Sequence, residues 1–140
     1  MGTWGVSPFG SDSAQDLLDT VGAMPPAERL ALVERTLASG VESGDSPSAT
    51  VLPDEVIAAV AIVAANLPGG HGLPWNDDVA GVVDWLPRPL PSGLPDLAAR
   101  ALDSAAPPDG WWWRSWVEES DRRAARDAID QVRAALSADR

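Results

Sequence analysis

Several residue types are missing or rare in this chain, and each absence removes a class of chemistry. The 140 residues include no cysteine, no tyrosine, no lysine and a single histidine, His71. Without cysteine the chain has no disulfide framework, no thiolate metal site and no cysteine nucleophile. A zinc site is disfavoured as well, because one histidine leaves too few of the usual ligands. We therefore expect no metal and no cofactor.

What is abundant is negative charge. The formal net charge is -11, with 21 acidic residues against ten arginines. Phosphate backbones and anionic lipids repel such a chain, so nucleic-acid binding and a membrane-surface role are both disfavoured. A basic protein partner would be attracted, although high net charge also keeps a protein soluble whatever its function. The N-terminus lacks a basic segment followed by an apolar stretch, and we expect a cytoplasmic protein without a signal peptide.

The spacing of apolar residues predicts an all-α fold with a single domain over residues 1–140. Apolar residues recur at helical intervals, and no segment shows sustained strand alternation. Helices are expected at about 13–22, 26–39, 53–65, 76–86, 94–105 and 120–138. The run Val56–Ala65 is apolar on all faces, which is typical of a buried central helix and too short to cross a bilayer. The sum is five to seven helices around one core.

Polar and glycine-rich segments separate these helices. Ser13 is expected to cap the first helix, and Gly40 is expected to end the second. Residues 41–52 should form a mobile polar loop. Residues 1–12 form an aromatic lead-in whose large side chains, Trp4 and Phe9, should dock on the helices that follow, because their burial is favourable.

The N-terminal segment MGTWGVSPFGSDSAQD resembles the start of a family of small bacterial proteins, domain of unknown function 4259. The matching residues are Met1, Gly2, Trp4, Gly5, Pro8, Phe9, Asp12, Ala14 and Asp16. A middle helix rich in alanine and valine, and a tryptophan-containing segment before the last helix, also fit the family. The chain departs at Gly10 and Ser11, where the family usually has Asp-Asn. The resemblance implies a compact bacterial domain, with Trp4, Gly5, Phe9 and Asp12 as motif residues, but no reaction.

Trp111, Trp112, Trp113 and Trp116 form the most conspicuous cluster. Three consecutive residues spread over about 200° of a helix surface, and they alternate between the two faces of a strand. One core face cannot hold all three, so at least one should lie at the surface or under the lead-in. Packing against Trp4 and Phe9 is one interpretation, a protein interface is a second, and a small-ligand pocket is a third.

Three other patterns suggest a catalytic, a metal-binding or a phosphate-binding site. His71 would act as a general base if Asp77 or Asp78 oriented it, or it is simply an exposed loop histidine. Asp77 and Asp78 with Asp84, or Asp54 with Glu55, would suit Mg²⁺ or Ca²⁺, but the helix macrodipole alone explains acidic residues at helix starts. The spacing of Gly5 and Gly10 fits a phosphate loop, yet Ser11 stands where that motif needs lysine.

Two functions follow from these observations. The first is a non-enzymatic protein-interaction module, an immunity- or antitoxin-like binder of a basic protein, which would use the tryptophan cluster together with Asp77 and Asp78. The alternative is a small-ligand- or metal-binding domain, or a hydrolase, that uses the loop between His71 and Asp77. The charge, the tryptophan cluster and the shortage of catalytic groups favour the first. An exposed tryptophan would also suit a homodimer.

Overall fold

The computed structural model describes residues 7–43, 52–107, 113 and 118–138. Within these ranges the chain forms five α-helices, three short 3₁₀-helices and no strand, which confirms the all-α prediction. The α-helices are α1 (Asp12–Gly22), α2 (Pro26–Ser43), α3 (Pro53–Ala65), α4 (Leu94–Ala105) and α6 (Glu119–Ala138). The 3₁₀-helices are η1 (Pro68–Gly70), η2 (Pro74–Asp78) and η3 (Val82–Asp84). No described helix is both long and apolar enough to cross a membrane.

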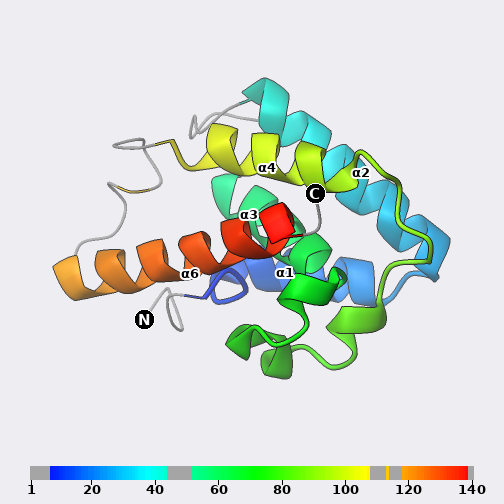
Figure 1. Cartoon of the computed structure of the whole chain (residues 1–140), viewed down its shortest axis with the longest axis horizontal. Coiled ribbons are helices and arrows are strands. Elements are labelled where there is room, and N and C mark those ends of the chain that lie inside the picture. Colours follow the sequence, from blue (N-terminus) through cyan, green and yellow to red (C-terminus); the bar gives the residue numbers. More distant parts are fainter. Residues whose placement is uncertain (1–6, 44–51, 108–112, 114–117, 139–140) are drawn as a thin grey trace.

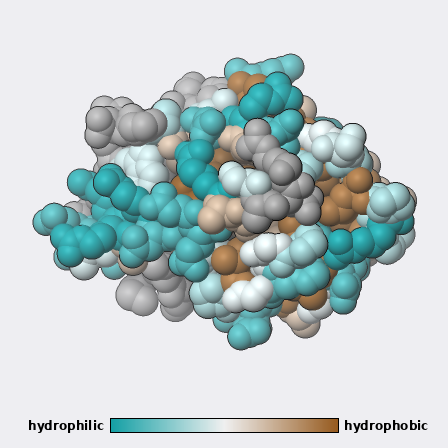
Figure 2. All heavy atoms as spheres, viewed as in Figure 1, coloured by the Kyte–Doolittle hydropathy of each residue, from teal (hydrophilic) through white to brown (hydrophobic). Residues whose placement is uncertain are grey.

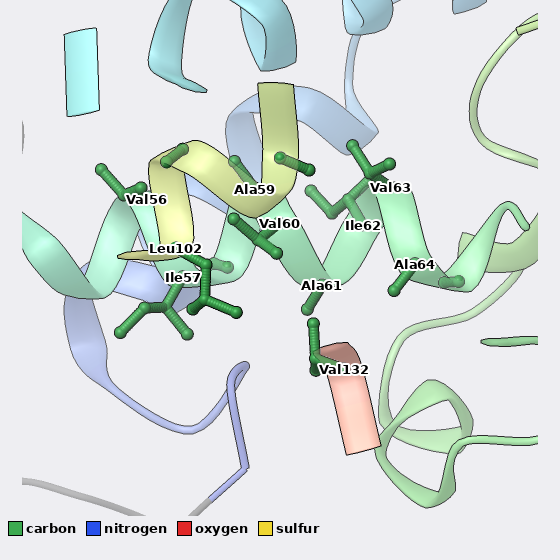
Figure 3. Close-up of a cluster of buried hydrophobic side chains, with 14 of the residues drawn as sticks. Val56, Ile57, Ala59, Val60, Ala61, Ile62, Val63, Ala64, Leu102 and Val132 are labelled. Carbon is green, nitrogen blue, oxygen red and sulfur yellow. The ribbon is translucent and has the colours of Figure 1, made fainter. Parts of the chain in front are cut away.

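Helix α3 is the centre of the molecule. It packs against α1, α2, α4 and α6, which surround it on different sides (Figure 1). Every residue from Val56 to Ala65 is buried, and side chains such as Leu102 of α4 and Val132 of α6 point towards it (Figure 3). A helix that is apolar on all faces has no polar face that could be exposed to water, so neighbouring elements must cover it on every side. The predicted central helix is confirmed.

Helix α1 begins slightly earlier than the sequence pattern predicts. Ser11 is the N-cap, and its Oγ accepts a hydrogen bond from the backbone N–H of Ala14 at 3.1 Å. The prediction that Ser13 caps the helix is therefore wrong, because Ser11 already satisfies a free N–H of the first turn. The predicted apolar face is buried as expected: Ala14, Leu17, Leu18 and Val21. Phe9 is 1% exposed and docks on the core as predicted, whereas Trp4 lies outside the described residues.

Helix α2 runs past Gly40, which the sequence analysis places after its end. Gly40 is buried inside α2, where an added Cβ would lie 2.7 Å from a methyl carbon of Val56 in α3. This glycine allows two helices to approach closely, and it does not end a helix. Val41 to Ser43 therefore belong to α2 and not to the predicted loop. Of its remaining residues, Leu52 is the N-cap of α3, and residues 44–51 lie outside the described part of the chain.

The predicted helix over residues 76–86 is wrong. The segment forms two separate 3₁₀ turns, η2 and η3, which are joined through Gly81 at φ +72°. Asn76 was expected to stand at the start of this helix, but its amide donates backwards to the carbonyls of Gly70 and His71 at 2.8 and 3.2 Å. The left-handed backbone at Gly81 breaks the helical repeat.

The last two helices match their predicted positions. Helix α4 spans the predicted residues, and α6 begins at Glu119, one residue before the expected start. The predicted apolar face of α6 is buried: Ala125, Ile129, Val132 and Leu136. Arg133 of α6 forms an ion pair with Asp103 of α4, which joins the two helices at the surface.

Candidate functional site

Acidic side chains are distributed unevenly along the chain. Residues 1–84 contain 12 acidic residues and two basic ones, whereas residues 85–140 contain nine acidic and eight basic ones. Almost the entire net charge therefore belongs to the part that forms α1, α2, α3, η2 and η3. Each described acidic residue of this part is exposed or half-buried: Asp12, Asp16, Asp19, Glu28, Glu34, Glu42, Asp54, Glu55, Asp77, Asp78 and Asp84. One large part of the molecular surface is thus strongly anionic.

Helix α1 presents the most uniform part of this surface. Asp12, Asp16 and Asp19 are exposed, and the helix contains no basic residue. In the part of the chain that the structure describes, none of these three carboxylates accepts a hydrogen bond or forms an ion pair. Their charges are therefore neutralised only by solvent ions, which a cationic partner would displace.

Of the two arginines in residues 1–84, Arg29 is hydrogen-bonded to backbone carbonyls within the fold. It donates from Nε to the carbonyl of Val21, from Nη2 to Gly22 and from Nη1 to Trp85, at 3.1 to 3.3 Å. Its Cζ also lies 5.4 Å from the ring centroid of Trp85. This guanidinium holds the carbonyl end of α1, where a cation is favoured. It is directed at backbone carbonyls and forms no ion pair with the carboxylates of α1.

Helix α6 differs, because its charges alternate in sign. Arg123 pairs with Glu119 one turn earlier at 3.5 Å, and Arg133 pairs with Asp103. Figure 2 shows hydrophilic residues along α6, with hydrophobic atoms reaching this face only in small separate patches. Interleaved charges of both signs are typical of a solvated helix face. They produce little long-range field, so α6 is a poor match for a highly charged partner.

Only one member of the predicted tryptophan cluster can be placed. Trp113 is half-buried, its Nε1 donates to the carbonyl of Ala106 at 3.1 Å, and Arg126 of α6 lies over its ring at 5.6 Å. The ring therefore bridges the end of α4 and the side of α6. The rest of the predicted aromatic site lies outside the described residues: Trp111, Trp112 and Trp116, as do the motif residues Trp4 and Gly5.

Asp77 and Asp78, the acidic members of the predicted site, are exposed in η2. In Figure 1 this segment, in green, lies well away from the end of α4, to which Trp113 is bonded. The structure therefore does not bring the two aspartates together with the one tryptophan that it places. Asp77 and Asp78 extend the anionic surface of residues 1–84, and Trp113 belongs to the side with mixed charge.

His71 is exposed directly after η1. Its backbone carbonyl accepts a hydrogen bond from Asn76, but no bond joins its imidazole to Asp77 or Asp78 within the described structure. Among the same residues, no three side chains of the metal-binding types lie close enough to hold an ion. The loop has a defined backbone but no assembled catalytic pair.

The unequal division of charge is present in the residue order, but the total composition does not reveal it. The partner-binding aspartates predicted from the sequence are Asp77 and Asp78, and Asp16 and Asp19 are not among them. The position of Asp16 and Asp19 on the outer face of α1 follows from the burial of Leu17, Leu18 and Val21 on its inner face.

The fold is that of a small all-helical domain, and the surface formed by residues 1–84, which we call its anionic side, has nearly the whole net charge. Comparison with protein families then identifies the family: the model of DUF4259, a domain of unknown function, matches residues 2–134. The chain belongs to this family, as its N-terminal motif suggested. Searches of the curated proteins and of the solved structures found no match.

Proposed function

We propose that this chain is a non-enzymatic protein-interaction module that binds a basic protein. The observation behind the proposal is the imbalance of 12 acidic against two basic residues in residues 1–84. Such a surface attracts a cationic partner over several ångströms and speeds its encounter, an effect that salt weakens. Complementary charge also rejects partners of the same sign, so it contributes specificity as well as rate.

The unpaired carboxylates of α1 support this proposal further. Charges that serve only to stabilise a fold are usually paired or placed at helix ends, as Arg133 and Asp103 illustrate. Asp16 and Asp19 lie in the middle and second half of α1, beyond the first turn where the macrodipole favours carboxylates. Their benefit to the stability of the isolated protein is small, so solubility and binding remain as explanations, and the proposal adopts binding.

The partner would be a basic protein of the same bacterial cytoplasm, and the relationship would be that of an immunity protein or an antitoxin to its target. In such a pair, the acidic protein covers a cationic surface that the target needs for its own activity. The same charge argues against direct binding to nucleic acid or to an anionic membrane.

The test is a pull-down from the lysate of the native cell with matched baits, read by mass spectrometry after washes at low and high salt. One variant removes charge from the anionic side, with Asp16, Asp19, Asp77 and Asp78 changed to asparagine. The control removes the same charge from α6 and the residue before it, with Glu118 changed to glutamine and Asp121, Asp127 and Asp130 to asparagine. Circular dichroism confirms that each bait is folded.

We expect one basic protein, in stoichiometric amount, on the wild-type and control baits, with release at high salt and loss from the first variant. That protein, expressed alone, should inhibit growth if the relationship is antitoxin-like. Absence of any such protein, or equal capture by both variants, would refute the proposal.

A further inference from the structure

The anionic side of the molecule contains a hollow between α1 and α2. The two helices diverge from the short turn that joins them, and α3 lies between them (Figure 1). On the α1 side the hollow is lined by Asp16, Leu17 and Thr20, and Glu55 at the start of α3 lines it as well. It is the place where apolar side chains and unpaired carboxylates of this surface meet.

The α2 side of the hollow adds a second leucine and one cation. Leu32 is half-buried and partly accessible, Thr36 and Ser39 lie one and two turns further on, and Arg35 is exposed. The hydroxyl of Thr36 donates to the carbonyl of Leu32 at 2.9 Å, and that of Thr20 donates to the carbonyl of Asp16 at 3.0 Å. Both hydroxyl protons are bonded within their own helices. The accessible lining of the hollow is more apolar than polar, and Leu17 and Leu32 are its apolar side chains.

Two charges at this hollow have no partner inside the described structure. Neither Asp16 nor Arg35 forms a hydrogen bond or an ion pair through its side chain there. Glu55 is already partly used, because its Oε1 accepts from the N–H of Leu52 at 3.3 Å. Arg35 is the one basic side chain that lines the hollow, so it opposes a cationic ligand there.

We infer that this α1–α2 hollow is the docking site for a basic, amphipathic segment of the protein partner; the inference rests on the proposed function. The hollow measures about 350 Å³. A helix about 10 Å across cannot sink into such a space, but one or two of its side chains can. A lysine or arginine would lay its aliphatic stem over Leu17 and Leu32 and bring its charged head to Asp16.

The other parts of the anionic surface fit this role less well. The aspartates of η2 are exposed, but they do not line a described hollow together with leucine side chains. Apolar contact area is needed to stabilise a complex beyond an encounter. The side that contains Trp113 and α6 has both signs of charge. At the α1–α2 hollow, acidic side chains and an apolar cleft coincide within the described residues.

The experiment is an NMR titration of the isotope-labelled full chain with a synthetic helical peptide composed of leucine and lysine. A matched peptide, in which serine replaces every leucine, separates apolar docking from general attraction between opposite charges. We expect the leucine–lysine peptide to shift the methyl signals of Leu17 and Leu32 and the amide signals of residues 16–20 and 32–39. The serine–lysine peptide should bind at least tenfold more weakly and shift signals over the whole anionic surface.

Two variants change the charge of the hollow in opposite directions. Arg35→Glu should tighten binding of the leucine–lysine peptide about three- to tenfold, because it replaces a repulsive charge with an attractive one. Asp16→Asn should weaken binding by a similar factor, while Asp77→Asn, outside the hollow, should change it little. The gain expected for Arg35→Glu cannot arise from misfolding.

Shifts that map to η2 or to Trp113, or an unchanged affinity for Arg35→Glu, would overturn the assignment of the hollow. Because the pull-down tests the basic partner independently, a partner captured there together with shifts elsewhere would leave the proposed function standing. Failure of the peptide to bind at all would also overturn the assignment.

Discussion

Asn66 terminates α3, and its buried amide links three parts of the chain. Its Nδ2 donates to the carbonyls of Ile62 and Val82 at 2.8 and 2.9 Å, and its Oδ1 accepts from the N–H of Leu86 at 3.1 Å. The N–H of Leu86 would otherwise lack a partner away from water, whereas the carbonyl of Val82 also accepts from the N–H of Trp85 at 3.2 Å. A buried polar group with all of its donors bonded stabilises one arrangement of neighbouring segments and excludes others.

Replacing Asn66 by alanine should therefore destabilise the protein strongly. The change leaves the N–H of Leu86 buried without a partner and removes one of the two hydrogen bonds to the carbonyl of Val82, at a cost of about 1–3 kcal/mol in the free energy of unfolding. Urea unfolding followed by circular dichroism measures the loss. Gln131→Ala, an exposed change on α6, is the control, and a similar small effect of both changes would contradict the role of Asn66.

Two glycines only two positions apart offer a sharper comparison. A Cβ on Gly70 would lie 1.9 Å from the backbone oxygen of Ala64, whereas a Cβ on Gly72 would meet nothing within 4 Å. We expect Gly70→Ala to destabilise the fold by about 2 kcal/mol or more, because the backbone of η1 must move away from α3. Gly72→Ala should be neutral or slightly stabilising, through the entropy of the unfolded chain.

Thermal unfolding of Gly70→Ala, Gly72→Ala and the wild type measures the change in stability that each substitution causes. Equal melting temperatures for the two would mean that η1 does not approach α3 as closely as described.

At the scale of elements, Arg29 decides how α1, α2 and η3 meet. It extends from α2 to the last carbonyls of α1 and to the carbonyl of Trp85 directly after η3. Three hydrogen bonds in a planar fork, with the guanidinium near the Trp85 ring, suit arginine and not lysine. The contact also keeps α1 and α2 close at their joined ends, from which they diverge to form the α1–α2 hollow.

Arg29→Met should cost about 1–3 kcal/mol of stability, since three carbonyls lose a charged donor. Arg29→Lys should recover only part of the loss, because an ammonium group cannot reach three carbonyls in a fork. Arg35→Met, two turns further along α2, is the matched control and should lie within about 0.5 kcal/mol of wild type. A full recovery with lysine would show that charge alone accounts for Arg29.

At the scale of the whole molecule, the unequal division of charge should affect stability as well as the proposed binding. The anionic side repels itself in the folded state, and salt reduces that repulsion. The mixed charges of α6 lack such a penalty, because each acidic group there has arginines within one or two turns.

Raising the salt concentration from about 0.02 M to about 0.5 M should therefore raise the melting temperature by roughly a few degrees. Asp16→Asn with Asp19→Asn should raise the melting temperature at low salt and reduce the response to salt. Asp127→Asn with Asp130→Asn, which removes the same charge from α6, should do neither. Differential scanning calorimetry on the three proteins tests this, and identical salt responses would contradict self-repulsion on the anionic side.

The residue order alone determined most of the helices and the interior of this protein. The periodicity of Leu17, Leu18 and Val21 oriented α1, and the apolar run of α3 placed that helix at the centre. Local patterns suffice for such features, since burial of an amphipathic face depends on spacing along one segment. The unequal division of charge can also be read from the residue order, but only the fold shows which surface these residues form.

Other features depended on contacts between segments far apart in the chain. Gly40 is typical of a residue that follows a helix end. It lies inside α2 because Val56 of α3 leaves no room for a Cβ there. Asn76 resembled a helix start, but its bonds to the preceding loop and the left-handed Gly81 divided the segment into 3₁₀ turns. The α1–α2 hollow arises from three helices that local propensity cannot orient relative to one another. Spacing determines which face of a helix is buried, whereas only tertiary packing determines what that face meets.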